Sequence, residues 1–237
     1  MSSGKNFRQA LAENNPLVIP GAINAYSAIL AEQSGHKALY LSGGGVAAAS
    51  YGIPDLGITT MEDVLIDVRR ISNASSLPLL VDIDTGWGGA FNISRTIKEM
   101  IDAGAGAVHM EDQISQKRCG HRPNKSLVSS EEMQDRIKAA VDGRHDESFF
   151  LMARTDAIAS EGINAAIDRA AAYVEQGADG IFLEAATSLE EYKIFKEHIK
   201  TPLLANITEF GKTPLFTKDQ LGDVGVDMVL FPLTAFR

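Results

Sequence analysis

The sequence predicts an α/β protein, and within that class a single (β/α)8 TIM-type barrel that covers residues 1–237. Short runs rich in Val, Ile and Leu alternate with amphipathic stretches, as parallel strands alternate with crossover helices. The segments AGAGAVHMED, QGADGIFLEA and VGVDMVLFP each join a small-residue turn to an apolar run, which indicates repeated βα units. No stretch rich in Pro, Gly or Ser divides the chain, so we expect one domain.

A doubly wound open sheet is the alternative architecture. A dinucleotide-binding sheet of that kind has GxGxxG directly after its first strand, and no such motif follows the first apolar run. The run Gly43–Gly45 does follow a predicted strand, but it lacks the required spacing. We therefore favour the barrel.

Eight strands are expected, because eight apolar runs are short and rich in residues with high strand propensity. They are Leu17–Pro20, Ala38–Leu41, Leu79–Asp84, Ala107–Asp112, Phe149–Thr155, Gly180–Glu184, Leu203–Ile207 and Met228–Phe231. Eight parallel strands are the number that closes a TIM-type barrel.

The stretches between the strands predict helices, and some begin or end at typical capping residues. Thr59 and Thr60 precede one helix, and Glu62 and Asp63 follow in its first turn, where acidic side chains stabilise a helix. Gly177 follows another helix as a C-cap. The predicted helices are Met61–Ile71, Ile93–Asp102, Glu131–Val141, Asn164–Glu175, Leu189–Ile199 and Lys218–Leu221.

The end of the chain does not fit a complete barrel. Arg237 follows the eighth predicted strand so closely that the last covering helix and any further C-terminal helices have no room. We expect the outer face of that strand to be uncovered unless another subunit supplies a helix. We favour a longer natural C-terminus.

Composition excludes several classes of partner. The formal net charge is −9, whereas a nucleic-acid-binding face needs clustered basic residues, so we expect no nucleic acid partner. The apolar runs are too short to span a membrane, and the N-terminus lacks the apolar core of a signal peptide. A single cysteine cannot form an internal disulfide, which fits a cytoplasmic protein in a reducing compartment.

Polar residues follow most of the predicted strands, where TIM-type barrels carry their active sites. Asp82 and Asp84 are two apart on one predicted strand, so both side chains should point the same way, close to Glu111. Three carboxylates without His or Cys favour Mg2+, with Mn2+ as a second possibility. The alternative is that these carboxylates pair with Arg154 and Lys117 instead.

The chain's only cysteine, Cys119, lies in the basic segment KRCGHRPNK. Neighbouring positive charge stabilises a thiolate, so we expect the pKa of this thiol to be lower than that of a free cysteine. The segment is also suited to holding an anion. We interpret it as a loop that closes over a metal-bound substrate, with Cys119 moving a proton. The alternative is a surface cysteine in a basic loop. His109, inside an apolar strand, is expected to be a core histidine with one hydrogen bond.

Together, the motifs YLSGGGVAA, PDLGI, DxD at Asp82 and Asp84, EDQ, KRCGHRPNK, MARTDA and LANITEFG closely resemble the 2-methylisocitrate lyase family, in the isocitrate lyase and phosphoenolpyruvate mutase superfamily. The resemblance extends from Gly4 to Arg237. It implies a barrel, bound Mg2+, a homotetramer, and cleavage of the tricarboxylate 2-methylisocitrate to pyruvate and succinate in propionate catabolism.

The resemblance also implies roles for individual positions. Asp82 and Asp84 match the metal site, with Glu111 beside it. Phe182 and Leu230 match positions where isocitrate lyases carry bulkier aromatic residues, so they should leave space for the extra methyl group. The positions that match substrate-binding residues are Ser42, Gly43, Gly44, Cys119, Gly120, Arg154, Glu184, Asn206, Ile207, Thr208 and Arg237.

The expected chemistry follows from the charges of that substrate. Tyr40 or Asp55 would take the proton of the substrate hydroxyl, Cys119 would protonate the carbanion, and Arg154 and His121 would hold carboxylates. Two departures from the family are Leu183, where we expect proline, and the short C-terminus. The alternatives are an isocitrate lyase, a 2-oxo-acid decarboxylase of the same superfamily, or an inactive truncated barrel.

Overall fold

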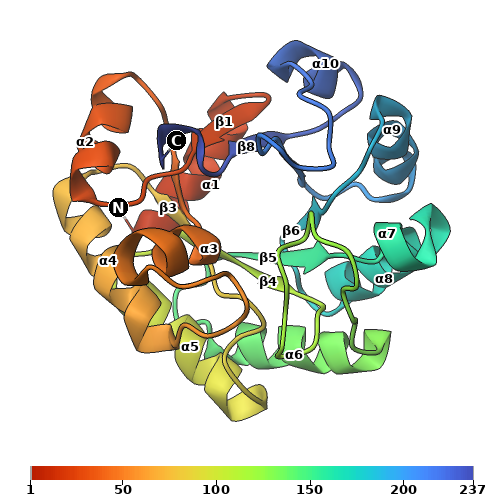
Figure 1. Cartoon of the computed structure of the whole chain (residues 1–237), viewed down its shortest axis with the longest axis horizontal. Helices are drawn as coiled ribbons and strands as arrows, with labels where there is room; N and C mark the ends of the chain where they lie inside the picture. The colour runs from red at the N-terminus through yellow and green to blue at the C-terminus, as the bar shows by residue number, and fades with distance from the viewer. Residues whose placement is uncertain (1, 237) are drawn as a thin grey trace.

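Eight parallel strands form the centre of the structure, a computed structural model that describes residues 2–236 (Figure 1). All eight predicted strands are present, most of them one or two residues shorter than expected. They are β1 (Leu17–Pro20), β2 (Leu39–Leu41), β3 (Leu79–Asp82), β4 (Ala107–Glu111), β5 (Phe150–Thr155), β6 (Gly180–Leu183), β7 (Leu203–Asn206) and β8 (Met228–Phe231). The predicted barrel is therefore confirmed.

The barrel is nearly closed. Every strand pairs in parallel with its neighbour in the order β1-β8-β7-β6-β5-β4-β3-β2. Between β1 and β2 the contact is a single bridge from Gly21 to Tyr40, with the Ala22 amide donating to the Tyr40 carbonyl at 2.8 Å. The two ends of the sheet thus meet at one point instead of along a ladder.

The strands are buried on both faces, which divides the core into two layers. Tyr40 and Leu80 point into the barrel interior with Phe182. Leu39 and Leu41, the neighbours of Tyr40 in the sequence, pack outward against the helices. This alternation follows from the period of two along a strand, and it explains why the strands are continuously apolar in sequence.

Helices surround the barrel (Figure 1). Thr60 caps α4 as predicted by accepting from the Asp63 amide, and Ser129 caps α6 by accepting from the Glu132 amide. The helices are α1 (Ser3–Glu13), α2 (Ala25–Gln33), α3 (Gly43–Val46), α4 (Met61–Ala74), α5 (Ala90–Asp102), α6 (Ser130–Gly143), α7 (Ile158–Glu161), α8 (Ile163–Glu175), α9 (Leu189–His198) and α10 (Lys218–Asp223). A π-helical turn (Ala47–Tyr51) continues α3, and a 3-10 turn spans Thr234–Phe236.

Four of these helices, the longer α1 and α2 and the four-residue α3 and α7, were not predicted from the sequence. The apolar face of α1 is narrow, because only Gly4, Phe7 and Ala10 are buried. Its Phe7 packs on Phe150 of the barrel interior, with ring centroids 5.3 Å apart. α2 buries only Ala28. Periodicity is a weak signal when so few side chains face the core.

The expectation that the outer face of the last strand is uncovered is wrong at its centre. Val229 of β8 points outward and is fully buried in the core between strands and helices. Phe231, the next outward residue, is half-buried against the same core, and α10 contributes the fully buried Leu221 to it. Within residues 2–236, no helix is long and apolar enough to cross a membrane.

Candidate active site

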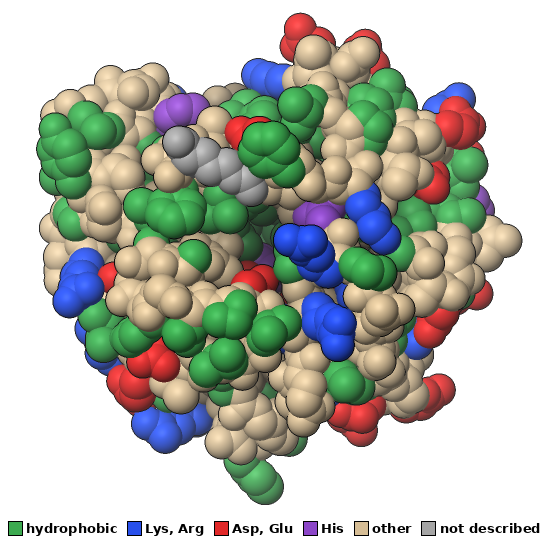
Figure 2. Space-filling view, in the orientation of Figure 1, with side chains coloured by type: hydrophobic (Ala, Val, Ile, Leu, Met, Phe, Trp, Pro, Cys, Tyr) green, Lys and Arg blue, Asp and Glu red, His purple; other side chains and the backbone are tan. Residues whose placement is uncertain are grey.

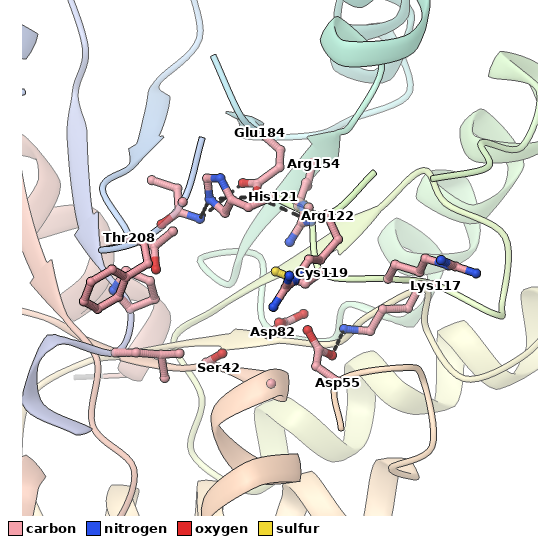
Figure 3. Close-up of a pocket in the computed structure, with 18 of the residues that line it drawn as sticks. Ser42, Asp55, Asp82, Lys117, Cys119, His121, Arg122, Arg154, Glu184 and Thr208 are labelled. Carbon is pink, nitrogen blue, oxygen red and sulfur yellow. Dashed lines mark hydrogen bonds and ion pairs between the residues drawn. The ribbon is translucent and has the colours of Figure 1, made fainter. Parts of the chain in front are cut away.

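A cavity of about 660 Å³ opens at the C-terminal ends of the strands. Figure 2 looks onto this face, where Lys and Arg side chains gather beside the central hollow. Figure 3 shows the side chains that point into it. Its lining is Tyr40, Ser42, Gly44, Pro54, Asp55, Leu56, Asp82, Lys117, Arg118, Cys119, Gly120, His121, Arg122, Pro123, Arg154, Phe182, Glu184, Asn206, Thr208, Glu209, Phe210, Gly211, Pro232 and Leu233. Most of the predicted site residues thus share one cavity.

The two predicted metal-binding aspartates converge through a turn and not through strand pleating. β3 ends at Asp82, and Asp84 lies in the following turn with φ 48°. The Asp84 amide donates to Asp82 Oδ1 at 3.0 Å, and the Gly43 amide donates to Asp82 Oδ2 at 3.1 Å. A Cβ at Gly43 would lie 3.1–3.3 Å from both carboxylates. The missing side chain therefore leaves room beside them.

Cations pair with two of the three predicted metal-binding carboxylates, Asp84 and Glu111. Lys117 Nζ is 2.6 Å from Asp84 Oδ1 and also pairs with Asp55. Arg154 Nη1 is 3.1 Å from Glu111 Oε2. These are the pairings that the sequence left open as the alternative to a metal ion.

Burial raises the pKa values of two of the three carboxylates, and neighbouring charges lower that of the third. It raises the pKa of Asp84 to about 7, assisted by repulsion from Asp82 and opposed by Lys117. It also raises the pKa of Glu111 well above the usual value, although Arg154 and Lys117 oppose the change. Burial would raise the pKa of Asp82 too, but His109, Lys117 and Arg154 lower it to about 2. Buried carboxylates with raised pKa values gain from any additional cation nearby.

The oxygen atoms present fit a small divalent ion. Within the described residues, no group of three or more His, Cys, Asp or Glu side chains is arranged around a common metal position. However, Glu111 Oε1 is buried without a hydrogen bond, and the space beside Gly43 is bordered by the carboxylates of Asp82 and Asp84. Hard oxygen donors of this kind suit Mg2+.

The thiol of Cys119 is half-buried in the cavity lining. The prediction of a lowered thiol pKa is wrong. Burial raises the pKa of Cys119, and Glu184 and Asp55 raise it further, against a hydrogen bond from the His121 backbone and the charge of Arg154. The basic neighbours do not reverse this effect, because Lys117 is engaged by Asp55 and Asp84, and Lys125 by Asp156.

His121 joins the cysteine loop to the ends of β6 and β7. Its Nε2 lies 3.2 Å from Glu184 Oε1 and 3.3 Å from Asn206 Nδ2. Its Nδ1 accepts from the Lys212 amide at 3.0 Å. Burial lowers the pKa of His121, so a neutral ring is favoured over an imidazolium. Asn206 also donates to Glu184 Oε2 at 3.2 Å, which fixes these three side chains relative to one another.

Gly120 lies directly against the charged side chains behind it. A Cβ at this position would come within 2.2 Å of Glu184 Oε1 and 2.5 Å of Arg154 Nη2. We predict that Gly120→Ala lowers kcat/KM by about tenfold or more, because the loop must move away from Arg154 and Glu184. The melting temperature should change little, since the loop is outside the core. A variant with unchanged kcat/KM would contradict this placement. Gly89→Ala is the control, because a Cβ there meets no atom within 4 Å and its backbone has a negative φ.

Some predicted site residues do not line the cavity. Ile207 points outward into the helix-facing core, and Leu230 is buried in the barrel interior. Gly43, Asp84 and Glu111 lie just behind the lining, close to Asp82 or Arg154. Arg237 lies outside the described residues.

Two residues near the site have structural environments that were only partly predicted. His109 is fully buried and its Nε2 is 2.9 Å from Tyr40 Oη, as expected for a core histidine with one hydrogen bond. Asp112, which follows Glu111 in the sequence, faces away from the cavity and accepts from Thr155 and Tyr173. Glu111 and Asp112 thus point to opposite faces of the sheet, as the alternation of side chains along a strand requires.

Sequence reasoning did not assign Arg118 or Arg122 to the site. Both are exposed at the cavity and make no ion pair with another described residue, although they stand beside Cys119 in the basic segment. Phe210, Gly211, Pro232 and Leu233 were also missed. Their position directly after β7 and β8 was the available signal, since loops at strand C-termini line barrel sites.

The fold and the cavity define the class: a TIM-type barrel with a polar cavity at the C-terminal ends of its strands, where barrel enzymes carry their active sites. The family model for phosphoenolpyruvate phosphomutase matches residues 7–237. The chain is 65% identical to a 2-methylisocitrate lyase from Shewanella oneidensis and 60% identical to one from Escherichia coli, covering 100% of this chain and 81% and 80% of those proteins. It belongs to the phosphoenolpyruvate mutase and isocitrate lyase superfamily, and within it to the 2-methylisocitrate lyase family.

Solved structures agree with this assignment. A 2,3-dimethylmalate lyase superposes with a TM-score of 0.95 at 35% identity, over 100% of this chain and 80% of that one. A phosphonopyruvate hydrolase, in complex with oxalate and Mg2+, superposes with a TM-score of 0.85 at 33% identity, over 98% of this chain and 81% of that one. The resemblance inferred from the sequence motifs is therefore confirmed.

Proposed function

We propose that this protein is a 2-methylisocitrate lyase that cleaves 2-methylisocitrate to pyruvate and succinate. The observation that carries the proposal is the 60–65% identity, over the whole chain, to several proteins of that name. The cavity supports it, because it combines a thiol, buried carboxylates and several cations at the strand ends. A tricarboxylate needs such positive charge, and a carbon–carbon cleavage needs a group that can deliver a proton.

Asp82, Asp84 and Glu111 are the residues that would hold Mg2+, in a family where one relative's structure contains that ion. When bound, the metal would withdraw electron density from substrate oxygens as negative charge develops. Two observations support this assignment: Glu111 Oε1 is buried without a hydrogen bond, and Gly43 has no side chain beside the carboxylates of Asp82 and Asp84.

Cys119 is proposed to deliver the proton that completes cleavage. A base removes the proton of the substrate hydroxyl, and the oxygen's electron pair forms the carbonyl of pyruvate. The carbon–carbon bond then breaks, and its electron pair moves to the carbon that becomes part of succinate. The Cys119 thiol protonates that carbon. The raised pKa of Cys119 keeps the proton on sulfur at neutral pH, as a donor requires.

Asp55 is the better of the two candidate bases. Burial and the charge of Asp82 raise the pKa of Tyr40 well above its usual value, so forming a phenolate there is costly. Asp55 lines the cavity and pairs with Lys117, so its carboxylate is already at the edge of the space that the substrate would occupy.

Several residues are proposed to bind the substrate and set its specificity. Arg154, His121, Asn206 and Thr208 would hold carboxylates, together with Ser42, the turn at Gly43 and Gly44, and Gly120 of the cysteine loop. Phe182 is the stronger specificity candidate, because it lines the cavity, whereas Leu230 acts only from the layer beneath it. The resemblance also implies a homotetramer, which light scattering would test.

The proposed function has a direct test. Purified protein with Mg2+ should release pyruvate and succinate from 2-methylisocitrate, with much less glyoxylate from isocitrate. One methyl group is worth only a few kcal/mol, so the preference should be on the order of 10–200-fold in kcat/KM. Equal or better cleavage of isocitrate would identify an isocitrate lyase, and release of CO2 from a 2-oxo acid would indicate a decarboxylase.

A further inference from the structure

One buried carboxylate, Asp156, connects the cysteine loop to the substrate-binding arginine. Its side chain is 0% exposed. Oδ2 accepts from Arg154 Nε at 2.9 Å, while Oδ1 accepts from Arg154 Nη2 at 3.2 Å and from Lys125 Nζ at 2.7 Å. A single acid therefore pairs with two cations that belong to different parts of the site.

The position of Asp156 is itself fixed from behind. Its amide donates to Asp112 Oδ1 at 2.9 Å, and Asp112 Oδ2 accepts from Thr155 at 2.8 Å and from Tyr173 of α8 at 2.9 Å. Asp112 thereby joins β5 to the end of β4 and to the helix layer. Asp156 is thus a rigid point of attachment on the barrel.

Lys125 is unusual for a lysine in a surface loop, because its side chain is only 3% exposed. Burying an ammonium group is costly unless it is paired. The charges of Arg154 and Lys125 outweigh burial and lower the pKa of Asp156, so the carboxylate stays ionised. Arg118 and Arg122 of the same loop remain exposed. Lys125 therefore serves the barrel and not the substrate.

The backbone between Lys125 and the thiol is short and turned. The Arg122 amide donates to the Cys119 carbonyl at 2.8 Å, and Asn124 has φ 62°. On the other side of the turn, Gly120 rests on Arg154 and Glu184. A displacement of Lys125 would therefore be transmitted to Gly120 and Cys119.

We propose that Asp156 is a positioning residue that aligns two parts of the reaction at once: Arg154 directly, and Cys119 through Lys125. Lys125 is then the anchor of the cysteine loop. This proposal rests on the proposed function for its kinetic part only, because the position of the thiol can be measured without turnover.

The primary test is Lys125→Met, read by the rate at which iodoacetamide alkylates the thiol. Cys119 is the only cysteine in the chain, so the signal is unambiguous. Without this ion pair the loop should open more often, expose the thiol and speed alkylation about tenfold. A tenfold change corresponds to only part of the free energy that is lost when a buried ion pair is broken. If Lys125 acted only through its charge, its removal would stabilise the thiolate less and slow the reaction. Slower or unchanged alkylation would overturn the proposal.

Lys196→Met is the matched control. Lys196 Nζ pairs with Asp227 at 2.6 Å, also partly buried, at the opposite end of the barrel. This variant should leave alkylation and turnover unchanged, whereas Lys125→Arg should restore slow alkylation because arginine can still pair with Asp156. Acceleration in the control equal to that in Lys125→Met would show a general loss of stability and overturn the proposal.

Turnover separates the roles of the two residues. Lys125→Met should lower kcat for 2-methylisocitrate about tenfold or more with a small change in KM, because only the thiol is displaced. Asp156→Asn should lower kcat and raise KM, because Arg154 also loses its partner. If wild-type protein does not cleave 2-methylisocitrate, the proposed function fails, and the alkylation rates still decide whether Lys125 anchors the loop.

Discussion

Cys119→Ser is expected to lose most turnover of 2-methylisocitrate while keeping the affinity for substrate. A proton donor placed at the reacting carbon contributes about 10²–10⁴-fold to a rate, and a serine hydroxyl is a much weaker acid than a thiol. The structure gives no reason for the fold to change, because the thiol is only half-buried and lies outside both core layers. The loss should appear in kcat, with KM within a few-fold of wild type.

Two measurements distinguish this role from a structural one. Binding of succinate, followed by calorimetry, should be the same in Cys119→Ser and wild type. In deuterated water, wild-type protein should exchange a proton of succinate when pyruvate is absent, and the variant should not. Near-full activity in Cys119→Ser would show that the thiol does not carry the proton.

Removal of divalent metal is the second change with a large expected effect. Treatment with EDTA should abolish cleavage, and added Mg2+ should restore it, because a metal at developing oxygen charge is worth several kcal/mol, or about 10³-fold or more. Burial raises the pKa values of Asp84 and Glu111, so a bound cation would also offset an unfavourable concentration of buried acids. Activity that survives chelation would contradict the carboxylate assignment.

Direct binding of Mn2+, followed by its paramagnetic resonance, tests the same residues without turnover. Asp84→Asn should weaken Mn2+ binding strongly, whereas Asp135→Asn, in an exposed ion pair on α6, should not. The Asp84 variant also removes one of the two acidic partners of Lys117, so a matched Lys117→Met variant shows how much of the change comes from that pair. Equal Mn2+ affinity in wild type and Asp84→Asn would place the metal elsewhere.

Much of the fold could be predicted because the hydrophobicity of each strand reflects how deeply it is buried. Strands such as β3 and β6 are buried on both faces, so their sequences are apolar up to the point where Asp82 and Glu184 begin the polar ends. Helices with strong caps, such as α4 after Thr60, were equally visible. Helices that bury few side chains, such as α1 and α2, were missed for the opposite reason.

The composition of the site was more predictable than its electrostatics. Asp82, Arg154 and Glu184 could be placed because they end strands. The raised pKa of Cys119 could not be predicted, because it depends first on the burial of the thiol and then on which charges lie near it in space. Lys117 and Lys125 stand close to Cys119 in the sequence, but in space each serves a carboxylate contributed by a distant segment. Charge counted along a chain therefore overstates the charge that acts on one atom.

The single bridge between Gly21 and Tyr40 gives the barrel a seam. Elsewhere neighbouring strands would have to lose a ladder of hydrogen bonds to separate, but β1 and β2 are joined only at this bridge, where the Ala22 amide donates to the Tyr40 carbonyl. Tyr40 also reaches inward to His109 and Asp82. Local opening between β1 and β2 would therefore displace Tyr40 and its contact with Asp82 directly. The edge of the barrel with the fewest strand-to-strand contacts thus lies next to the candidate active site.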